Sequence, residues 1–216
     1  MSKNLKKRIY TSAALLTILS FMLINNFVLG YFLLILSIFS VLEFCKIISI
    51  IFKKEKIKRF LINLFFLLYI FSFSSAFLIL SYFLHLKILI FLILMTCVAS
   101  DIGGFVIGKL IKGKKLTKLS PNKTISGAIG SLIFSIIFFS VVIYYLTKNF
   151  EIYFLGIGFL TSIACQTGDL FFSFLKRKSF IKDTSNFLPG HGGILDRVDG
   201  ILLGIPVGFL SLLMIY

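Results

Sequence analysis

Long apolar runs, separated by short basic segments, dominate this sequence and leave it few possible folds. A helix needs about 20 mainly apolar residues to cross a hydrocarbon core of roughly 30 Å. Most of the runs reach that length, and they cover approximately residues 9–29, 31–52, 60–82, 87–108, 125–146, 153–175 and 197–216. We therefore expect an all-α, polytopic integral membrane protein with about seven transmembrane helices, the first of them uncleaved.

The composition excludes a water-soluble fold. The chain is 58% hydrophobic, whereas soluble domains have an apolar fraction of roughly 45–50%. The apolar runs use most of the 216 residues, so residues 1–216 are expected to form a single membrane domain. Cys45, Cys97 and Cys165 all fall inside apolar runs, where we expect them to be small core residues.

The basic residues predict how the chain is oriented in the membrane. Twenty of the 23 Lys and Arg residues lie before the first run or in the segments after the second, fourth and sixth runs. By the positive-inside rule these segments, and the N-terminus, are cytoplasmic. The net charge of +15 does not indicate nucleic-acid binding, because the basic residues punctuate apolar runs instead of covering a solvated face.

The few acidic residues gather near the predicted cytoplasmic side. A carboxylate at membrane depth costs at least roughly 2.5–3.5 kcal/mol, so one that persists there usually faces a polar cavity or a cation. Asp101 and Asp169 fit that description, and simple pairing with a neighbouring lysine is the alternative for each. Five of the eight acids lie in or beside the two longest cytoplasmic segments: Asp101, Asp169, Asp183, Asp196 and Asp199.

Two sets of residues that include these acids have helical spacing. Asp169, Ser173 and Lys176 follow one another at i, i+4 and i+7, which places them on one helix face. Asp196 and Asp199 are three residues apart where the seventh run begins, a spacing that lets two carboxylates approach one metal ion or two adjacent ions. The alternative is that these two acids only complement the start of a helix.

Two cytoplasmic segments have features of anion-binding loops. The first is Pro189 to Gly193, in which glycines around His191 would expose backbone N–H groups to a phosphate. The second is SPNKT at residues 120–124, where Ser120, Lys123 and Thr124 precede the fifth run and its free N–H groups. An ordinary loop histidine and an ordinary helix cap are the alternatives.

Glycines in the fourth and seventh runs are expected to have a packing role. Gly200, Gly204 and Gly208 recur every four residues, a pattern that favours close helix packing over chemistry. Gly104 and Gly108 are expected to act in the same way.

The stretch from Ser173 to Asp199, SFLKRKSFIKDTSNFLPGHGGILDRVD, resembles the signature of the phosphatidate cytidylyltransferases, or CDP-diacylglycerol synthases. Its fixed positions are filled by Ser173, Lys176, Arg177, Lys182, Asp183, His191, Gly192, Gly193, Asp196, Arg197 and Asp199. The resemblance is strongest over a catalytic part at 91–216, with cytoplasmic loops 109–124 and 176–196. Residues 1–90 share hydropathy with the family, and Glu43 matches an acidic position. Ser126 departs from the pattern, because an acidic or amide residue is common there.

The resemblance implies a transferase that moves CMP from CTP to phosphatidate at the cytoplasmic face of the inner membrane. It implies Mg²⁺ as cofactor, with a second, monovalent cation left open, and membrane lipids and a second copy of the chain as partners. The implied catalytic residues are Asp169, Asp196, Asp199, Lys182 and Asp183, of which Asp169, Asp196 and Asp199 would hold the metal. The implied substrate-binding residues are Ser173, Lys176, Arg177, His191, Gly192, Gly193, Arg197, Ser120, Lys123 and Thr124.

Three other functions share parts of this pattern. The string DRVDG is similar to the motif of the CDP-alcohol phosphotransferases, but that motif needs further aspartates and no acid follows Asp199. A transporter would use Asp101 and Asp169 as ion sites, but the charged residues crowd one face of the membrane and no repeat is visible. A cytidylyltransferase for a related acceptor, such as an ether lipid, stays open.

Overall fold

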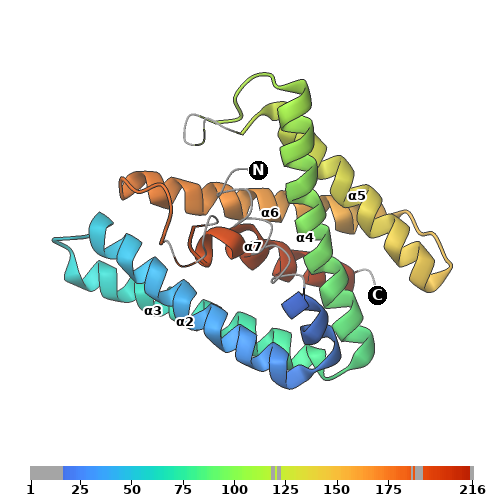
Figure 1. Ribbon diagram of the computed structural model, residues 1–216, viewed down its shortest axis with the longest axis horizontal. Helices are drawn as coiled ribbons and strands as arrows, with labels where there is room; N and C mark the ends of the chain where they lie inside the picture. The colour runs from blue at the N-terminus through green and yellow to red at the C-terminus, as the bar shows by residue number, and fades with distance from the viewer. Residues whose placement is uncertain (1–16, 118–119, 121–122, 186, 188–191, 215–216) are drawn as a thin grey trace. The chain divides into compact units, whose positions relative to one another are not determined.

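A computed structural model describes residues 17–117, 120, 123–185, 187 and 192–214 (Figure 1). Within these ranges the chain is all-α and has no β-strand, and Lys115 and Thr124 form an isolated antiparallel bridge. Residues 17–24 are helical. The long helices are α2 (Asn26–Ile51), α3 (Lys56–Ser81), α4 (Leu84–Ile111), α5 (Ile125–Thr147), α6 (Tyr153–Lys178) and α7 (Leu195–Leu213).

The helices confirm a polytopic membrane protein. Among the residues described, five helices, α2 to α6, are long and apolar enough to cross a membrane. Helix α7 has 19 residues and three charged side chains in its first turns. The first predicted span, 9–29, lies partly outside the described residues. The total of seven spans and the cytoplasmic N-terminus therefore stay predictions.

The boundary between the first two spans lies at a different residue from the one predicted. The sequence placed it at Gly30, but the helix break falls at Asn25, whose extended backbone begins α2. The Asn25 side chain accepts a hydrogen bond from the Phe27 N–H at 2.8 Å and so satisfies one of the free donors of the helix end. Gly30 instead lies inside α2, where a Cβ would be 3.7 Å from Leu78.

The chain divides into two compact units. The first contains residues up to 87 together with 175–198, and the second contains 88–174 together with 199 onward. In the first unit α2 and α3 run side by side (Figure 1). The Phe44 and Phe66 rings stack with centroids 3.8 Å apart, and the Ser37 and Ser74 hydroxyls lie 2.7 Å apart between the same helices.

In the second unit, small residues bring helices α4, α5, α6 and α7 into close contact. A Cβ on Gly204 would lie 2.5 Å from Cys97 Sγ, and one on Gly208 would lie 2.5 Å from Thr161 Oγ1. The Gly200 position is equally crowded, 2.7 Å from Cys165 Sγ. The packing role predicted for the glycines of the seventh run is thus confirmed. Cys97 and Cys165 are buried core residues, as expected.

Candidate functional site

A cavity of about 540 Å³ lies in the second unit among α4, α5, α6 and the segment before α5. It is the place where most of the polar groups predicted from the sequence for this unit come together. Its lining combines two carboxylates, two lysines, hydroxyls, an amide and several glycines: Asp101, Asp169, Lys109, Lys123, Thr124, Ser131, Gln166, Gly104, Gly108 and Gly127.

Glycines form the wall where α4 and α5 approach each other. A Cβ on Gly127 would lie 2.9 Å from the Gly104 carbonyl oxygen, and one on Gly108 would lie 3.0 Å from Thr124 Oγ1. Real Cβ atoms are rarely this close to a neighbour, so the two backbones can approach only because side chains are missing. This confirms the packing role predicted for Gly104 and Gly108, and it brings the start of α5 into the cavity wall.

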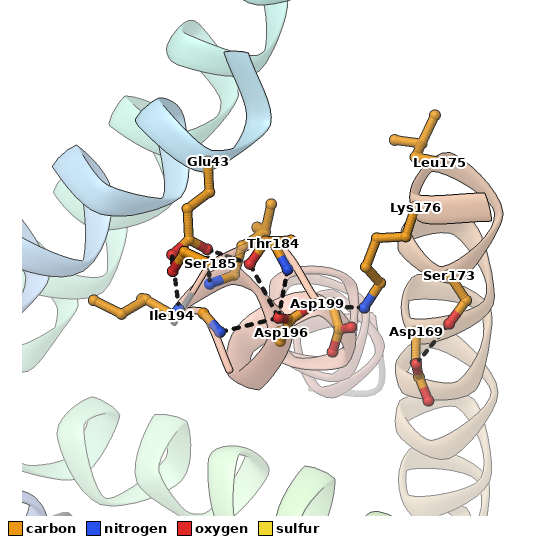
Figure 2. Close-up of polar contacts among 12 residues, drawn as sticks. Glu43, Asp169, Ser173, Leu175, Lys176, Thr184, Ser185, Ile194, Asp196 and Asp199 are labelled. Atoms are coloured by element: carbon orange, nitrogen blue, oxygen red, sulfur yellow. Dashed lines mark hydrogen bonds and ion pairs between the residues drawn. The ribbon is translucent and has the colours of Figure 1, made fainter. Parts of the chain in front are cut away.

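Asp169 is the central charged group of the cavity. Its carboxylate forms an ion pair with Lys123, and the side chains of Asp169 and Lys123 are 33% and 26% exposed. The Ser173 hydroxyl donates to Asp169 Oδ1 at 3.4 Å from the next turn of α6 (Figure 2). Pairing with a lysine, the alternative kept for Asp169, is therefore present, and the carboxylate still borders open space.

A backbone turn holds Lys123 at the start of α5. The Leu116 N–H donates to the Lys123 carbonyl at 2.8 Å, and the Lys123 N–H donates to the Ser120 carbonyl at 3.1 Å. Thr124 caps α5, because its hydroxyl accepts from the Gly127 N–H at 3.1 Å. The helix-cap interpretation is thus confirmed. Pro121 and Asn122 of the SPNKT run lie outside the described residues, and anion binding there stays a prediction.

The first unit contains a second polar cluster, built around the buried Glu43 of α2. Its carboxylate is only 5% exposed, yet it accepts four hydrogen bonds (Figure 2). Two come from the hydroxyls of Thr184 and Ser185, at 2.6 and 2.5 Å. The other two come from the backbone N–H groups of Ile194 and Leu195, at 3.1 and 2.9 Å, where α7 begins. Glu43 therefore ties two parts of the 176–196 loop, called the signature loop below, to α2.

Asp196 completes this cluster from the first turn of α7. Its Oδ2 accepts from the backbone N–H groups of Thr184 and Gly193 at 2.9 and 3.0 Å, and its Oδ1 accepts from Lys176 Nζ at 2.7 Å. Burial alone would raise the pKa of the Asp196 carboxyl, but the Lys176 ammonium and the two N–H groups outweigh it and hold this pKa below its usual range. Asp196 is therefore an ionised anchor between α6 and the loop.

Glycine is required in the loop where these carboxylates converge. A Cβ on Gly193 would lie 2.5 Å from Glu43 Oε2, so any side chain would displace the carboxylate. Gly192 has a φ of +84°, and a Cβ there would lie 3.0 Å from Asp196 Oδ2 and 3.6 Å from the Asp183 side chain. Both glycines predicted in the loop thus let the backbone approach another group closely, and that group is a carboxylate of the same chain.

Asp199 belongs to the second unit, where α7 crosses α6. The residue is 8% exposed, and its Oδ1 accepts from the Gly200 N–H at 2.9 Å. A Cβ on Gly168 would lie 2.6 Å from the Asp199 carbonyl oxygen. Because Gly168 directly precedes Asp169, the carboxylates of Asp169 and Asp199 come from neighbouring turns of two tightly packed helices.

The other predicted site residues lie at the surface or outside the described ranges. Arg177, Lys182, Asp183 and Arg197 are exposed, and nothing is described for His191. Within the described ranges, no group of three or more His, Cys, Asp or Glu side chains is gathered closely enough to hold a metal ion. A metal bound by two carboxylates and the phosphates of a substrate would not form such a group.

The sequence matches the cytidylyltransferase family over residues 3–215. The chain belongs to this family. Its similarity to a phosphatidate cytidylyltransferase of Helicobacter pylori reaches 44% identity over 113 residues, which is 52% of this chain and 42% of the relative. A Staphylococcus aureus protein of the same name is 40% identical over 110 residues, or 50% of this chain and 42% of that protein. One from Rickettsia typhi is 39% identical over 128 residues, 55% of this chain and 56% of the relative.

The chain thus spans about half the length of the curated relatives it matches. The family resemblance predicted from residues 173–199 is confirmed. The contacts of this cytidylyltransferase family member also show two residues that were given no role from the sequence. Gln166 lines the cavity and donates to the Ala128 carbonyl at 3.3 Å. Glu43 was matched only to a family position, although a single carboxylate inside a 26-residue apolar helix already indicated a buried polar partner.

Proposed function

We propose that this chain transfers CMP from CTP to phosphatidate, forming CDP-diacylglycerol and releasing pyrophosphate. The observation that carries the proposal is the cavity of the second unit, where Asp169 and Lys123 pair beside the capped start of α5. Carboxylates that can bind a cation, and ammonium groups that can bind phosphates, are the two components that a nucleotidyl transfer between anions requires.

The reaction needs charge control more than proton transfer. An oxygen of the phosphatidate phosphate attacks the α-phosphorus of CTP, and the bond from that phosphorus to the bridging oxygen breaks as pyrophosphate leaves. A phosphomonoester has a second pKa near 6, so it is largely dianionic at pH 7 and needs little help from a base. The barrier lies in bringing two anions together and in stabilising the leaving group.

The basic residues of this chain would supply that stabilisation. The Lys123 ammonium is held by its ion pair with Asp169 at the cavity wall, and the Lys176 ammonium is held by Asp196 at 2.7 Å. Fixed ammonium groups lose little entropy when they bind a phosphate, so both are suited to orient substrate. The exposed Arg177, Lys182 and Arg197 would bind the remaining phosphate oxygens from the aqueous side.

The carboxylates present fit the Mg²⁺ ion that the resemblance implies. Asp169 is one-third exposed at the cavity, Asp101 lines the same cavity, and hard carboxylate oxygens are preferred Mg²⁺ ligands. Asp169, Asp196 and Asp199 are the proposed ligands, and Asp196 could take part only by giving up some of its three hydrogen bonds to Lys176 and to the Thr184 and Gly193 N–H groups. When bound, the ion would neutralise phosphate oxygens and stabilise the charge that develops on pyrophosphate.

The proposed setting is the cytoplasmic face of the inner membrane. A lipid acceptor would reach the site sideways from the leaflet, and CTP would reach it from water. The resemblance also implies a homodimer, which light scattering of the purified chain in detergent would test.

The direct test is the formation of labelled lipid from radiolabelled CTP, phosphatidate and Mg²⁺ by membranes that contain the chain. We expect Asp169→Asn and Asp196→Asn each to lower the rate by about a hundredfold or more, because each removes a charge near the phosphates. Glu151→Gln is the matched control: it also neutralises one acid, but on the opposite predicted side of the membrane, and we expect it to keep full activity.

Two results would contradict the proposal. Unchanged product in both Asn variants would remove these aspartates from the mechanism. Labelled product with an ether-lipid phosphate, but none with phosphatidate, would assign the chain to a related acceptor.

A further inference from the structure

A second cavity lies in the first unit, on a face formed by α2 and α3. It measures about 310 Å³ and contains Lys56 and Arg59 beside Cys45 of α2. Its lining also includes apolar side chains, among them Val41 and Leu67. None of these residues contributes to the polar clusters described above, so the cavity needs an explanation of its own.

The cavity continues into a long apolar groove. A neighbouring depression of about 620 Å³ lies between the same two helices, and Val41 and Leu67 line both spaces. Along α3 the lining changes from Lys56 to Asn63 and then to Leu67, at helical spacings that keep all three on one face. The face is therefore basic at its first turn and apolar beyond its third.

Asn63 adds a specific polar feature at the boundary between the two parts. Its Oδ1 is buried, and among the residues that the structure describes none donates a hydrogen bond to it. A buried acceptor without a partner is unfavourable, so such an atom usually has a donor in the functional state. The Asn63 side chain lines the cavity together with Arg59, and a rotation of its amide would bring Oδ1 to a donor on a ligand there.

We propose that this face binds an anionic phospholipid whose headgroup carries a hydroxyl. The phosphate lies between Lys56 and Arg59, the hydroxyl donates to Asn63 Oδ1, and an acyl chain follows the groove past Val41 and Leu67. The acid that directly precedes α3, Glu55, already forms an ion pair with Lys58 and does not line the cavity. The start of α3 is predicted to be cytoplasmic, which places the cavity at the leaflet where anionic lipids concentrate.

A phospholipid explains the face better than a second copy of the chain. A symmetric dimer in a membrane uses the same patch on both subunits, so Lys56 and Arg59 of both copies would meet in one interface. Like charges brought together in this way are unfavourable, whereas a phosphate neutralises them. Lipid binding here is also independent of catalysis, so its test does not depend on the proposed function.

Cys45 provides a probe within the cavity. Cys97 and Cys165 are 0% and 1% exposed, whereas Cys45 is partly exposed and lines the cavity. We would measure alkylation of Cys45 by mass shift in detergent micelles to which phosphatidylglycerol or phosphatidylcholine is added. We expect phosphatidylglycerol to slow alkylation severalfold and phosphatidylcholine to have little effect.

Variants separate the cavity from general surface charge. Lys56→Gln with Arg59→Gln should require about tenfold more phosphatidylglycerol for the same protection. Lys53→Gln with Lys54→Gln removes the same charge from the loop just before α3 but not from the cavity, and should behave as the unaltered chain does. Val41→Phe, which fills the junction of the two spaces, should reduce the phosphatidylglycerol retained in native mass spectra, whereas Val98→Phe on α4 should not.

The proposal fails if the two lipids protect Cys45 equally. It also fails if the double variant of Lys56 and Arg59 and the double variant of Lys53 and Lys54 lose protection to the same extent. It also fails if Cys45 is protected without added lipid in proportion to protein concentration, because that result would assign the face to a second copy. Should Cys45 not react, equal retention of phosphatidylglycerol by Val41→Phe and by the unaltered chain would overturn the proposal as well.

Discussion

At the scale of single residues, Glu43 shows how a membrane helix can carry a buried charge. An unpaired carboxylate in this environment would be strongly unfavourable. Here four donors surround it, and two of them are N–H groups at the start of α7, where a helix favours negative charge. The same four bonds fix the signature loop. Glu43 is therefore a positioning residue for the loop.

Replacing Glu43 with Gln tests this role. The amide keeps the size of the side chain but turns one acceptor into a donor, so two of the four partners face an N–H₂ group. We expect a loss of about 2–3 kcal/mol in stability, measured as a lower midpoint of thermal unfolding in mild detergent.

The matched control for this variant is Glu55→Gln, which breaks an exposed ion pair with Lys58 and should leave the midpoint almost unchanged. Equal midpoints for Glu43→Gln and the unaltered chain would show that the four bonds do not stabilise the fold.

The limits of prediction are clearest at this scale. Asp169 and Lys123 could be chosen from the sequence because charged residues beside apolar runs are rare and signify a polar site. Their mutual pairing could not, because they are separated by 46 residues and depend on how α4, α5 and α6 pack. Glu43 was underestimated for the same reason: its partners all lie more than 140 positions away in the sequence.

At the scale of helices, glycine decides how closely α4 and α5 approach. A Cβ on Gly130 would lie 2.5 Å from Ile107 Cβ and 2.8 Å from the Gly103 carbonyl oxygen. The contact is therefore backbone against backbone. Membrane helices often pack in this way, because no hydrophobic effect drives them together. Because this contact forms one wall of the cavity, the spacing of the two helices also sets the geometry of the candidate site.

Adding one methyl group at this contact should separate the helices. We expect Gly130→Ala to cost about 1–3 kcal/mol of stability, since a packed interface must shift to admit it. Thermal unfolding and the labelled-lipid assay would measure the two consequences, and both the midpoint and the activity should fall.

Gly156→Ala in α6 is the control for this substitution. A Cβ there meets nothing within 4 Å, so the variant should gain up to about 1 kcal/mol from the better helix former. The packing argument would be wrong if the two alanine variants had the same midpoint.

Helix positions were largely predictable, because a run of about 20 apolar residues has few alternatives in a membrane. The predicted run 125–146 corresponds to α5 at Ile125–Thr147. The error at the boundary between the runs 9–29 and 31–52 has a physical cause: a membrane helix tolerates the glycine that lies between the runs, and Asn25 supplies the actual helix start. Composition alone does not distinguish a helix-breaking glycine from a packing glycine.

At the scale of the whole molecule, charge asymmetry predicts the orientation of the chain. The segment between α5 and α6 contains Lys148 as its one basic residue, whereas the segment between α4 and α5 contains five after Lys109. Lys and Arg are retained on the cytoplasmic side during insertion, so the two segments should lie on opposite sides. This arrangement would place the SPNKT turn and the signature loop on the same, cytoplasmic side.

Cysteine mapping tests this orientation. Lys114→Cys and Asn149→Cys place single thiols in the two segments, and both positions are exposed. In inside-out vesicles, a thiol reagent that cannot cross membranes should label Lys114→Cys and spare Asn149→Cys, and right-side-out vesicles should give the reverse. The native cysteines lie within membrane helices, so the unaltered chain gives the background.

Labelling of both variants from one side would mean that α5 does not cross the membrane. The opposite pattern would place the SPNKT turn outside, away from the CTP that the proposed reaction requires.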